Sequence, residues 1–322
     1  MAREAALDLV TVGRISVDLY AREPHAGFRD PQTFSKSVGG SPTNVAVAAA
    51  RLGRTAAVVT KVGDDDFGAF AREQLRRWGV TTDYVGTDPH APTPLAFASL
   101  DPPEEPQVVF YRGPAAPDTT LVEADLPAEV CRGARVFWMS VGALAQGSTA
   151  AASFAWLADR ARAPHTILDL DYRPSLWPDA ATARAAARRA IDLSTIVVGN
   201  RAECEMAVGT SEPADAATAL LDAGVGIAII KMGGGGVLLA EPGGRWLIEP
   251  IPVPVVCGLG AGDAFGGALV HGLLSGWDLP RIGRFANSAG AYVVGQLTCA
   301  DAMPTVADLD TMLAHADPGA TT

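Results

Sequence analysis

The sequence predicts an α/β fold, a doubly wound and mainly parallel sheet flanked by helices, with a small β lid. Short β-branched runs alternate with Ala-rich segments along most of the chain, which is the pattern of strand–helix–strand units. Most of these runs are largely apolar, as expected for strands that are covered on both faces. The 322 residues are 48% hydrophobic, and we expect a single domain over residues 1–322.

The strands are expected where short apolar runs are bounded by turn or helix-start residues. In chain order they are Leu9–Val12, Ala56–Val62, Val136–Ser140, Thr166–Leu170, Thr195–Val198 and Gly226–Lys231.

The helices are expected between these strands and after the last one. The first begins with a cap residue followed by proline, which is a typical helix start. In chain order they are Ser41 to before Gly53, Asp65–Trp78, Ser148–Arg162, Thr182–Leu193, Ala202–Val208, Ala214–Ala223, Asp263–Ser275 and Pro280–Val294.

Two regions interrupt the alternation, at about 20–37 and 84–117. Both contain prolines and short strand-like runs, among them 95–100 and 107–112. Inserts of this length are often lids or binding elements, and a decorative hairpin is the alternative. We expect the tail after Pro318 to be disordered.

Composition excludes several classes of partner. The net charge is −11, from 25 basic and 36 acidic residues, and no long basic run is present, so we expect neither nucleic acid nor a membrane surface as partner. The sequence has no N-terminal apolar core and no apolar run of about eighteen residues, so we expect a cytoplasmic protein. The four cysteines form no CxxC pair, which argues against a metal site or a disulfide framework.

Gly260, Ala261, Gly262 and Asp263 stand at the start of a predicted helix. Small residues let a ligand approach the backbone, and the first N–H groups of a helix are unpaired and attract anions. The sequence therefore predicts a pocket suited to phosphate. An aspartate there would repel a resting phosphate, so we interpret Asp263 as a base that takes a proton from an alcohol. A helix cap is the alternative for this residue.

Further polar and glycine residues follow the first strand and open the first helix. Asp18 comes after Leu9–Val12, and ligands bind at the carboxyl ends of strands in open α/β sheets. Gly39 and Gly40 let a hydroxylated ligand meet the backbone, and Asn44 can donate and accept hydrogen bonds at once. A turn carboxylate and a tight turn with an ordinary cap are the alternatives.

Two residue pairs are typical of charged ligands. Asn200 and Glu203 are three apart on one helix face and could hold a hydrated Mg²⁺, although this spacing is also common at helix starts. Arg112 and Arg173 each follow a strand-like run, and arginine binds carboxylate or phosphate bidentately. Near a sugar pocket they would favour an acidic sugar, and a salt bridge is the alternative for each.

Two common nucleotide motifs are missing from the sequence. It contains no Gly-x-x-x-x-Gly-Lys-Ser/Thr, and Gly13 is followed by Arg14, Ile15 and Ser16 instead of a dinucleotide-binding fingerprint. The glycine run 233–236 is predicted to be a turn, although it could admit a nucleotide close to the backbone.

With these residues in place, the chain resembles the ribokinase-like (PfkB) family of carbohydrate kinases from about Leu7 to Leu313. The resemblance is carried by the two segments 39–44 (Gly-Gly-Ser-Pro-Thr-Asn) and 260–263 (Gly-Ala-Gly-Asp). It implies a ribokinase-like fold and an enzyme that uses ATP and Mg²⁺ to phosphorylate a sugar hydroxyl. It also implies that the two inserts form a lid over the sugar, through which we expect a homodimer.

The resemblance also implies roles for individual residues. Asp263 is the catalytic base, and Gly260, Ala261 and Gly262 form an anion hole. The sugar is held by Asp18, Gly39, Gly40 and Asn44, Mg²⁺ and the phosphates by Asn200 and Glu203, and the nucleotide by Lys231, Gly233 and Asn287. Many relatives carry an aspartate that helps to bind a monovalent cation where this chain has Cys257, so potassium activation is left open.

Within the family, the segments 16–20, 110–112, 169–174 and 299–305 resemble the 5-dehydro-2-deoxygluconokinases of inositol catabolism. Their substrate is a keto sugar acid. Arg112 and Arg173 resemble the carboxylate-binding arginines of 2-keto-3-deoxygluconate kinases. The alternatives are a kinase of that type or of the fructokinase or ribokinase type, a nicotinamide-dependent dehydrogenase, and a non-catalytic sugar-binding regulator.

Overall fold

The computed structural model describes residues 6–113 and 115–316, and the tail after Pro318 lies outside them. A ten-stranded sheet forms its centre, with the order β14-β13-β12-β11-β10-β9-β1-β4-β5 and with β6 paired to β4. Pairing is parallel from β12 to β5, and β13 and β14 complete the sheet as antiparallel strands. Its strands are β1 (Leu9–Val12), β4 (Ala56–Gly63), β5 (Val80–Thr81), β6 (Val85–Asp88), β9 (Val136–Ser140), β10 (Thr166–Asp169), β11 (Ile196–Asn200), β12 (Ile227–Lys231), β13 (Val237–Glu241) and β14 (Gly244–Ile248).

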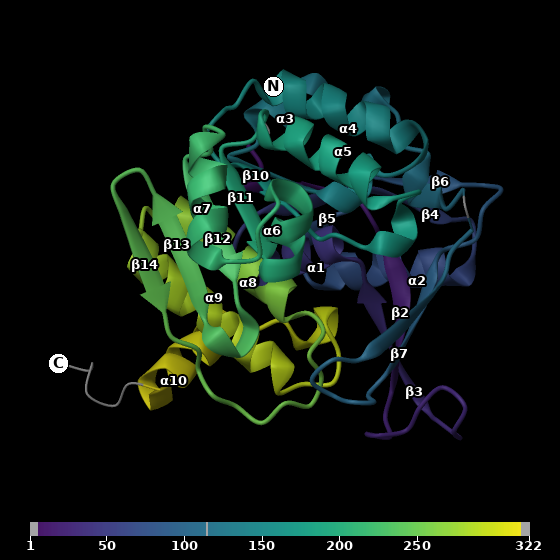
Figure 1. Ribbon diagram of the computed structural model, residues 1–322. Helices are drawn as coiled ribbons and strands as arrows, with labels where there is room; N and C mark the ends of the chain where they lie inside the picture. Colours follow the sequence, from purple (N-terminus) through teal and green to yellow (C-terminus); the bar gives the residue numbers. More distant parts are fainter. Residues whose placement is uncertain (1–5, 114, 317–322) are drawn as a thin grey trace.

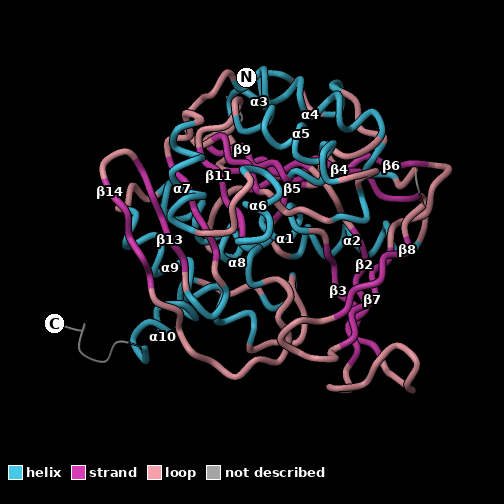
Figure 2. Tube along the Cα trace, in the orientation of Figure 1, coloured by secondary structure: helices cyan, strands magenta, loops and turns pink. Residues whose placement is uncertain are grey.

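Helices cover both faces of this sheet, which confirms the predicted fold class (Figures 1 and 2). One face packs with α1 (Ser41–Arg51), α2 (Asp66–Arg77), α8 (Ala261–Leu274), α9 (Leu279–Val294) and α10 (Val306–Ala316). The other packs with α3 (Ala128–Gly133), α4 (Gly147–Arg160), α5 (Ala180–Ile191), α6 (Arg201–Val208) and α7 (Pro213–Asp222).

Strand β1 shows why the strands are apolar along their whole length. Leu9 belongs to the hydrophobic cluster on one face, and Val10 and Val12 belong to the cluster on the other. Side chains alternate between the two faces of a strand, so both sets are buried only when helices cover both sides.

A second, four-stranded sheet projects from this body (Figure 1). It has the order β3-β2-β7-β8, from β2 (Ser16–Ala21), β3 (Phe34–Gly39), β7 (Leu95–Ser99) and β8 (Gln107–Tyr111). The predicted limits of the two inserts are wrong in two places. The sheet begins at Ser16 instead of about residue 20, and β6 of the second insert belongs to the main sheet.

The order in which strands are added to the sheet reverses at β1. The strands of this sheet that come next in the chain, β4 and β5, lie on one side of β1, and the later strands from β9 onwards lie on the other side. Crossover connections diverge at such a point and leave a crevice at the carboxyl ends of the strands. Arg14 follows β1, and Asp171 follows β10 at the same edge. The fold therefore collects polar side chains from distant parts of the sequence at one place.

Candidate active site

A cleft lies at the carboxyl edge of the main sheet, beneath the small sheet. About 670 Å³ of it is free of protein atoms. Of the predicted site residues, Asp18, Gly40, Asn44, Arg112, Arg173, Gly260 and Asp263 line it. The residues that sequence reasoning missed include Arg14, Ser41, Tyr20 and Cys299.

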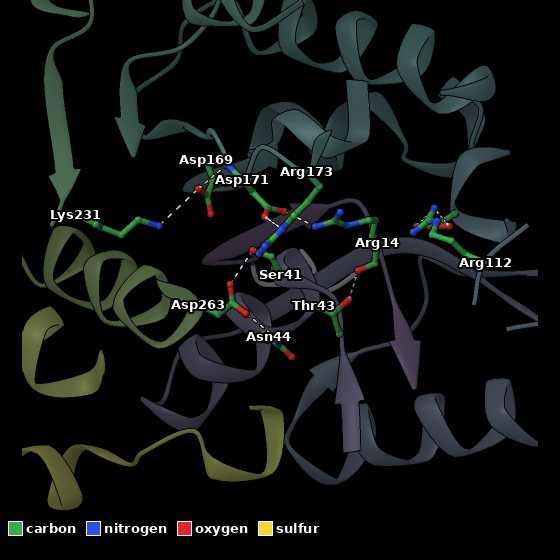
Figure 3. Close-up of polar contacts among 11 residues, drawn as sticks. Arg14, Ser41, Thr43, Asn44, Arg112, Asp169, Asp171, Arg173, Lys231 and Asp263 are labelled. Atoms are coloured by element: carbon green, nitrogen blue, oxygen red, sulfur yellow. Dashed lines mark hydrogen bonds and ion pairs between the residues drawn. The ribbon is translucent and has the colours of Figure 1, made fainter. Parts of the chain in front are cut away.

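Asp263 lies in the first turn of α8 and points towards α1 (Figure 3). Its Oδ1 accepts a hydrogen bond from the Ser41 hydroxyl at 2.7 Å, and its Oδ2 accepts one from the Asn44 amide at 2.8 Å. Burial raises the pKa of Asp263 to about 6, although both hydrogen bonds oppose the shift. The helix-cap alternative is wrong, because the residue at the cap position is Gly260 and no side chain caps this helix.

The backbone at the start of α8 is held in a form that favours glycine. Gly260 has a φ of 83°, and a Cβ there would lie 2.6 Å from the Cys299 sulfur. The amides of Asp263 and Ala264 donate to the Gly260 carbonyl, whereas those of Ala261 and Gly262 precede the first helical hydrogen bonds. A Cβ at Gly262 would lie 3.2 Å from the ammonium group of Lys231, which adds positive charge beside these amides.

Asp18 lies inside β2, the strand that follows β1, so the turn-carboxylate alternative is wrong. Its carboxylate accepts hydrogen bonds from Ser16 at 2.6 Å and from Tyr20 at 3.2 Å. Burial raises the pKa of Asp18 to about 6. Gly39 pairs across the sheet with Ser16, and a Cβ at Gly39 would overlap the Asp18 carboxylate at 1.9 Å. The glycine is therefore needed for Asp18 to take this position.

The two predicted arginines line the cleft and are ion-paired as well. Arg112, just after β8, contacts both oxygens of the buried Asp118, at 2.9 and 3.2 Å. The Arg173 Nε donates to Asp171 at 3.0 Å. Attraction to Asp171 raises the pKa of Arg173. Each arginine therefore forms a salt bridge, as the alternative stated, but uses only part of its guanidinium group for it. The other N–H groups can bind a ligand.

A second polar group lies at the end of β12, where Lys231 approaches Asp169 at 3.9 Å (Figure 3). Burial alone would lower the pKa of Lys231, but attraction to Asp169 and Glu203 outweighs it and raises the pKa. Burial raises the pKa of Asp169 to about 7 and also raises the pKa of Glu203. Burial disfavours the charged form of both carboxyl groups, and a positive charge beside them, from Lys231 or from a bound cation, favours it.

Asn200 and Glu203 form the reciprocal cap of α6. The Asn200 side chain accepts from the Glu203 amide at 2.9 Å, and the Glu203 carboxylate accepts from the Asn200 amide at 2.7 Å. The helix-start alternative is confirmed, while the oxygen donor set still suits a hydrated Mg²⁺.

Two predicted residues remain, Gly233 and Asn287, and neither lines the cleft; the other predicted residues that are not among its lining are Gly39, Asn200, Glu203, Lys231, Ala261 and Gly262. Gly233 is in the turn between β12 and β13, where a Cβ would meet open space. The Asn287 amide on α9 donates to the carbonyls of Ile248 and Glu249. Their contact with a nucleotide stays a prediction.

The sequence indicates only some of the site residues that the prediction missed. Ser41 belongs to the glycine-rich segment that was singled out, and its role follows from facing Asp263 across 222 positions of sequence. In the sequence, Arg14 is conspicuous only as a break in a dinucleotide-binding motif. Its ion pair with Asp171 joins residues 157 positions apart, which single-sequence patterns do not indicate.

Known proteins are similar to this chain over nearly its whole length. The model of the family described as "pfkB family carbohydrate kinase" matches residues 6–306. A 5-dehydro-2-deoxygluconokinase from Geobacillus thermodenitrificans is 32% identical over 317 residues, covering 96% of this chain and 94% of the relative.

Two solved structures are similar in fold. A fructokinase double mutant from Vibrio cholerae O395, in a form with fructose, ADP and potassium bound, aligns with a TM-score of 0.85 at 27% identity, over 97% of this chain and all (100%) of that one. A putative ribokinase II from E. coli aligns with a TM-score of 0.88 at 22% identity, over 96% and 99% of the two chains.

Proposed function

The chain belongs to the pfkB family of carbohydrate kinases and is a sugar phosphotransferase, and from this premise we propose that it phosphorylates the primary hydroxyl of a keto sugar acid with ATP. The substrate that we favour is 5-dehydro-2-deoxygluconate, as named for relatives about 31% identical over nearly the whole chain. The observation that carries the proposal is the layout of the cleft, in which buried carboxylates and arginines line the same space.

Asp263 takes the role of general base in this proposal. At neutral pH a carboxyl group with a pKa of about 6 is mostly ionised, yet it is basic enough to accept a proton from an alcohol. Ser41 and Asn44 fix its two oxygens, so its orientation does not depend on the substrate. Asp18 binds a sugar hydroxyl from the opposite wall, with its own orientation fixed by Ser16 and Tyr20.

The transferring phosphoryl group is placed at the start of α8. The free amides of Ala261 and Gly262 donate to its oxygens, and Lys231 contributes a full positive charge beside them. Glu203 and Asn200 would hold Mg²⁺, because they supply oxygen donors at the same edge of the sheet. The ion would supply charge neutralisation on the phosphates.

Three further features of the proposal are drawn from the resemblance. The small sheet closes over the sugar and excludes water, and a homodimer forms through it. The monovalent cation stays open in the proposal: this chain has Cys257 where many relatives have an aspartate, and backbone carbonyls would have to hold the ion.

The length and hydropathy of the helices bear on a separate question, namely whether any of them could span a membrane. Among the described residues, no helix has the length and apolar character that a membrane span requires.

The test is ATP-dependent phosphorylation, followed as ADP release, with 5-dehydro-2-deoxygluconate, 2-keto-3-deoxygluconate, fructose, ribose and adenosine. We expect a clear preference for a sugar acid. A preference for fructose or ribose would retain the kinase and overturn the proposed acid substrate. Turnover with none of them, together with binding of NAD(H), would favour a dehydrogenase.

A further inference from the structure

Arg14 is a buried arginine that nevertheless faces the cleft. It follows β1, the strand at which the strand order of the sheet reverses, and it is 8% exposed. Its backbone carbonyl accepts a hydrogen bond from Thr43 at 2.9 Å, which ties it to α1. Its guanidinium group lies over the backbone of Gly142, where a Cβ would come within 3.5 Å. The side chain is therefore held in place before any ligand binds.

Among the described residues, the Arg14 guanidinium group makes a single side-chain hydrogen bond, from its Nη2 to Asp171. Asp171 places one oxygen on Arg14 and the other on Arg173, so one carboxylate serves two guanidinium groups. Arg112 has Asp118. Asp18 and Asp263 in the same cleft also attract Arg14 and Arg173, so what the cluster offers a ligand's carboxylate is the guanidinium N–H groups that these partners leave unbonded. A guanidinium group has five N–H donors in a planar fork, so Arg14 can keep Asp171 while it binds a carboxylate of the ligand.

The three arginines follow one another along the cleft. Figure 3 shows Arg173 directed towards Asp263 and Ser41, with Arg14 beyond it and Arg112 farther still. A second, smaller hollow adjoins the cleft, and Arg14 and Arg112 line both of them. The two guanidinium groups therefore lie where the cleft and this hollow meet.

We propose that Arg14 determines specificity for an acidic sugar by binding the substrate's carboxylate between Arg112 and Arg173, at the end of the cleft away from Asp263. The inference rests on the proposed kinase function and adds a residue that reads the acid group. An open-chain sugar acid carries its carboxylate and its primary hydroxyl at opposite ends. One bound with its carboxylate at Arg14 directs its hydroxyl towards Asp263.

The test compares 5-dehydro-2-deoxygluconate with its neutral carboxamide as substrates for the wild type, Arg14→Met and Arg14→Lys. Arg132→Met is the matched control, because Arg132 also has a single aspartate partner, Asp159, but lies half-exposed on the surface. For Arg14→Met we expect kcat/KM for the acid to fall by about 10- to 100-fold, mainly through KM, with little change for the carboxamide. Arg14→Lys keeps a charge for Asp171 but loses the planar fork, so we expect a smaller fall in the same direction.

The outcomes separate this inference from the proposed function. If the wild type prefers the acid and Arg14→Met loses acid and carboxamide equally, Arg14 does not read the carboxylate, and the kinase proposal stands. If the wild type has no preference for the acid, the proposed substrate class is itself wrong. If Arg14→Met does not fold, Arg14→Lys decides, and an unchanged ratio of acid to carboxamide would overturn the inference.

Discussion

Replacing Asp263 by asparagine removes the proposed base while changing the shape of the side chain least. We expect kcat to fall at least about 100-fold, which corresponds to about 2.7 kcal/mol of activation free energy. Sugar and nucleotide binding should change little, because Ser41 can still donate to the remaining oxygen at position 263. The measurement is steady-state ADP release with saturating sugar acid and ATP–Mg²⁺.

The structure also predicts that this variant folds. The Asn44 Oδ1 is buried without a hydrogen-bond partner among the described residues, so a flip of the Asn44 amide would let it accept from an asparagine at position 263. The folded-state pKa of about 6, against an ordinary 3.8, means that the Asp263 contribution to stability falls as pH rises from about 4 to about 6. Ionisation at pH 7 then costs about 3 kcal/mol, which asparagine avoids. The variant should therefore unfold no earlier than the wild type at pH 7.

Asp18→Asn is the matched control for this experiment. Asp18 is also a buried carboxylate whose pKa is raised to about 6, and it also accepts two side-chain hydrogen bonds in the same cleft. We expect its replacement to raise KM for the sugar and to lower kcat much less than Asp263→Asn does. Near-normal turnover of Asp263→Asn, or equal losses of kcat in the two variants, would refute the assignment of Asp263 as the base.

Three further predictions follow from individual contacts. Because the base must be ionised, kcat/KM should fall as pH drops through about 6 and level off above it, and a flat profile down to pH 4.5 would contradict the raised pKa of Asp263. Gly260→Ala should cost more stability and turnover than Gly53→Ala, since both glycines have a φ near 84° but only Gly260 has Cys299 in the way; equal thermal shifts would show that the sulfur contact is unimportant. Glu203→Gln should raise the Mg²⁺ concentration needed for half-maximal activity without lowering the melting temperature, because glutamine can still accept from the Asn200 amide; an unchanged Mg²⁺ dependence would place the ion elsewhere.

The fold could be predicted from the sequence because its signals are local. Apolar runs such as Val136–Ser140 have no polar face, so they indicate strands covered on both sides, and every predicted strand and helix is present with its ends within about two residues. The elements that were missed are short or lie outside the alternation. They include β5, with two residues, and α10, which follows the last expected helix. Packing against the main body decides such elements more than their own composition does.

The candidate site, too, could be predicted from the sequence only in part. Asp263 and Gly260 belong to a compact motif with a physical meaning of its own, so they could be singled out. The partners that give Asp263 its orientation come from α1, and the ion pairs among Arg14, Asp171 and Arg173 join the ends of β1 and β10. Those contacts depend on which strands are neighbours, and a single sequence does not specify strand order.

The most direct test is a crystal structure of the protein with 5-dehydro-2-deoxygluconate and a non-hydrolysable ATP analogue. We predict the primary hydroxyl within about 3 Å of the Asp263 carboxylate, the γ-phosphate at the start of α8, and the substrate carboxylate against the guanidinium groups of Arg14 and Arg112. A sugar acid bound in the reverse direction, with its carboxylate at the start of α8, would contradict the account.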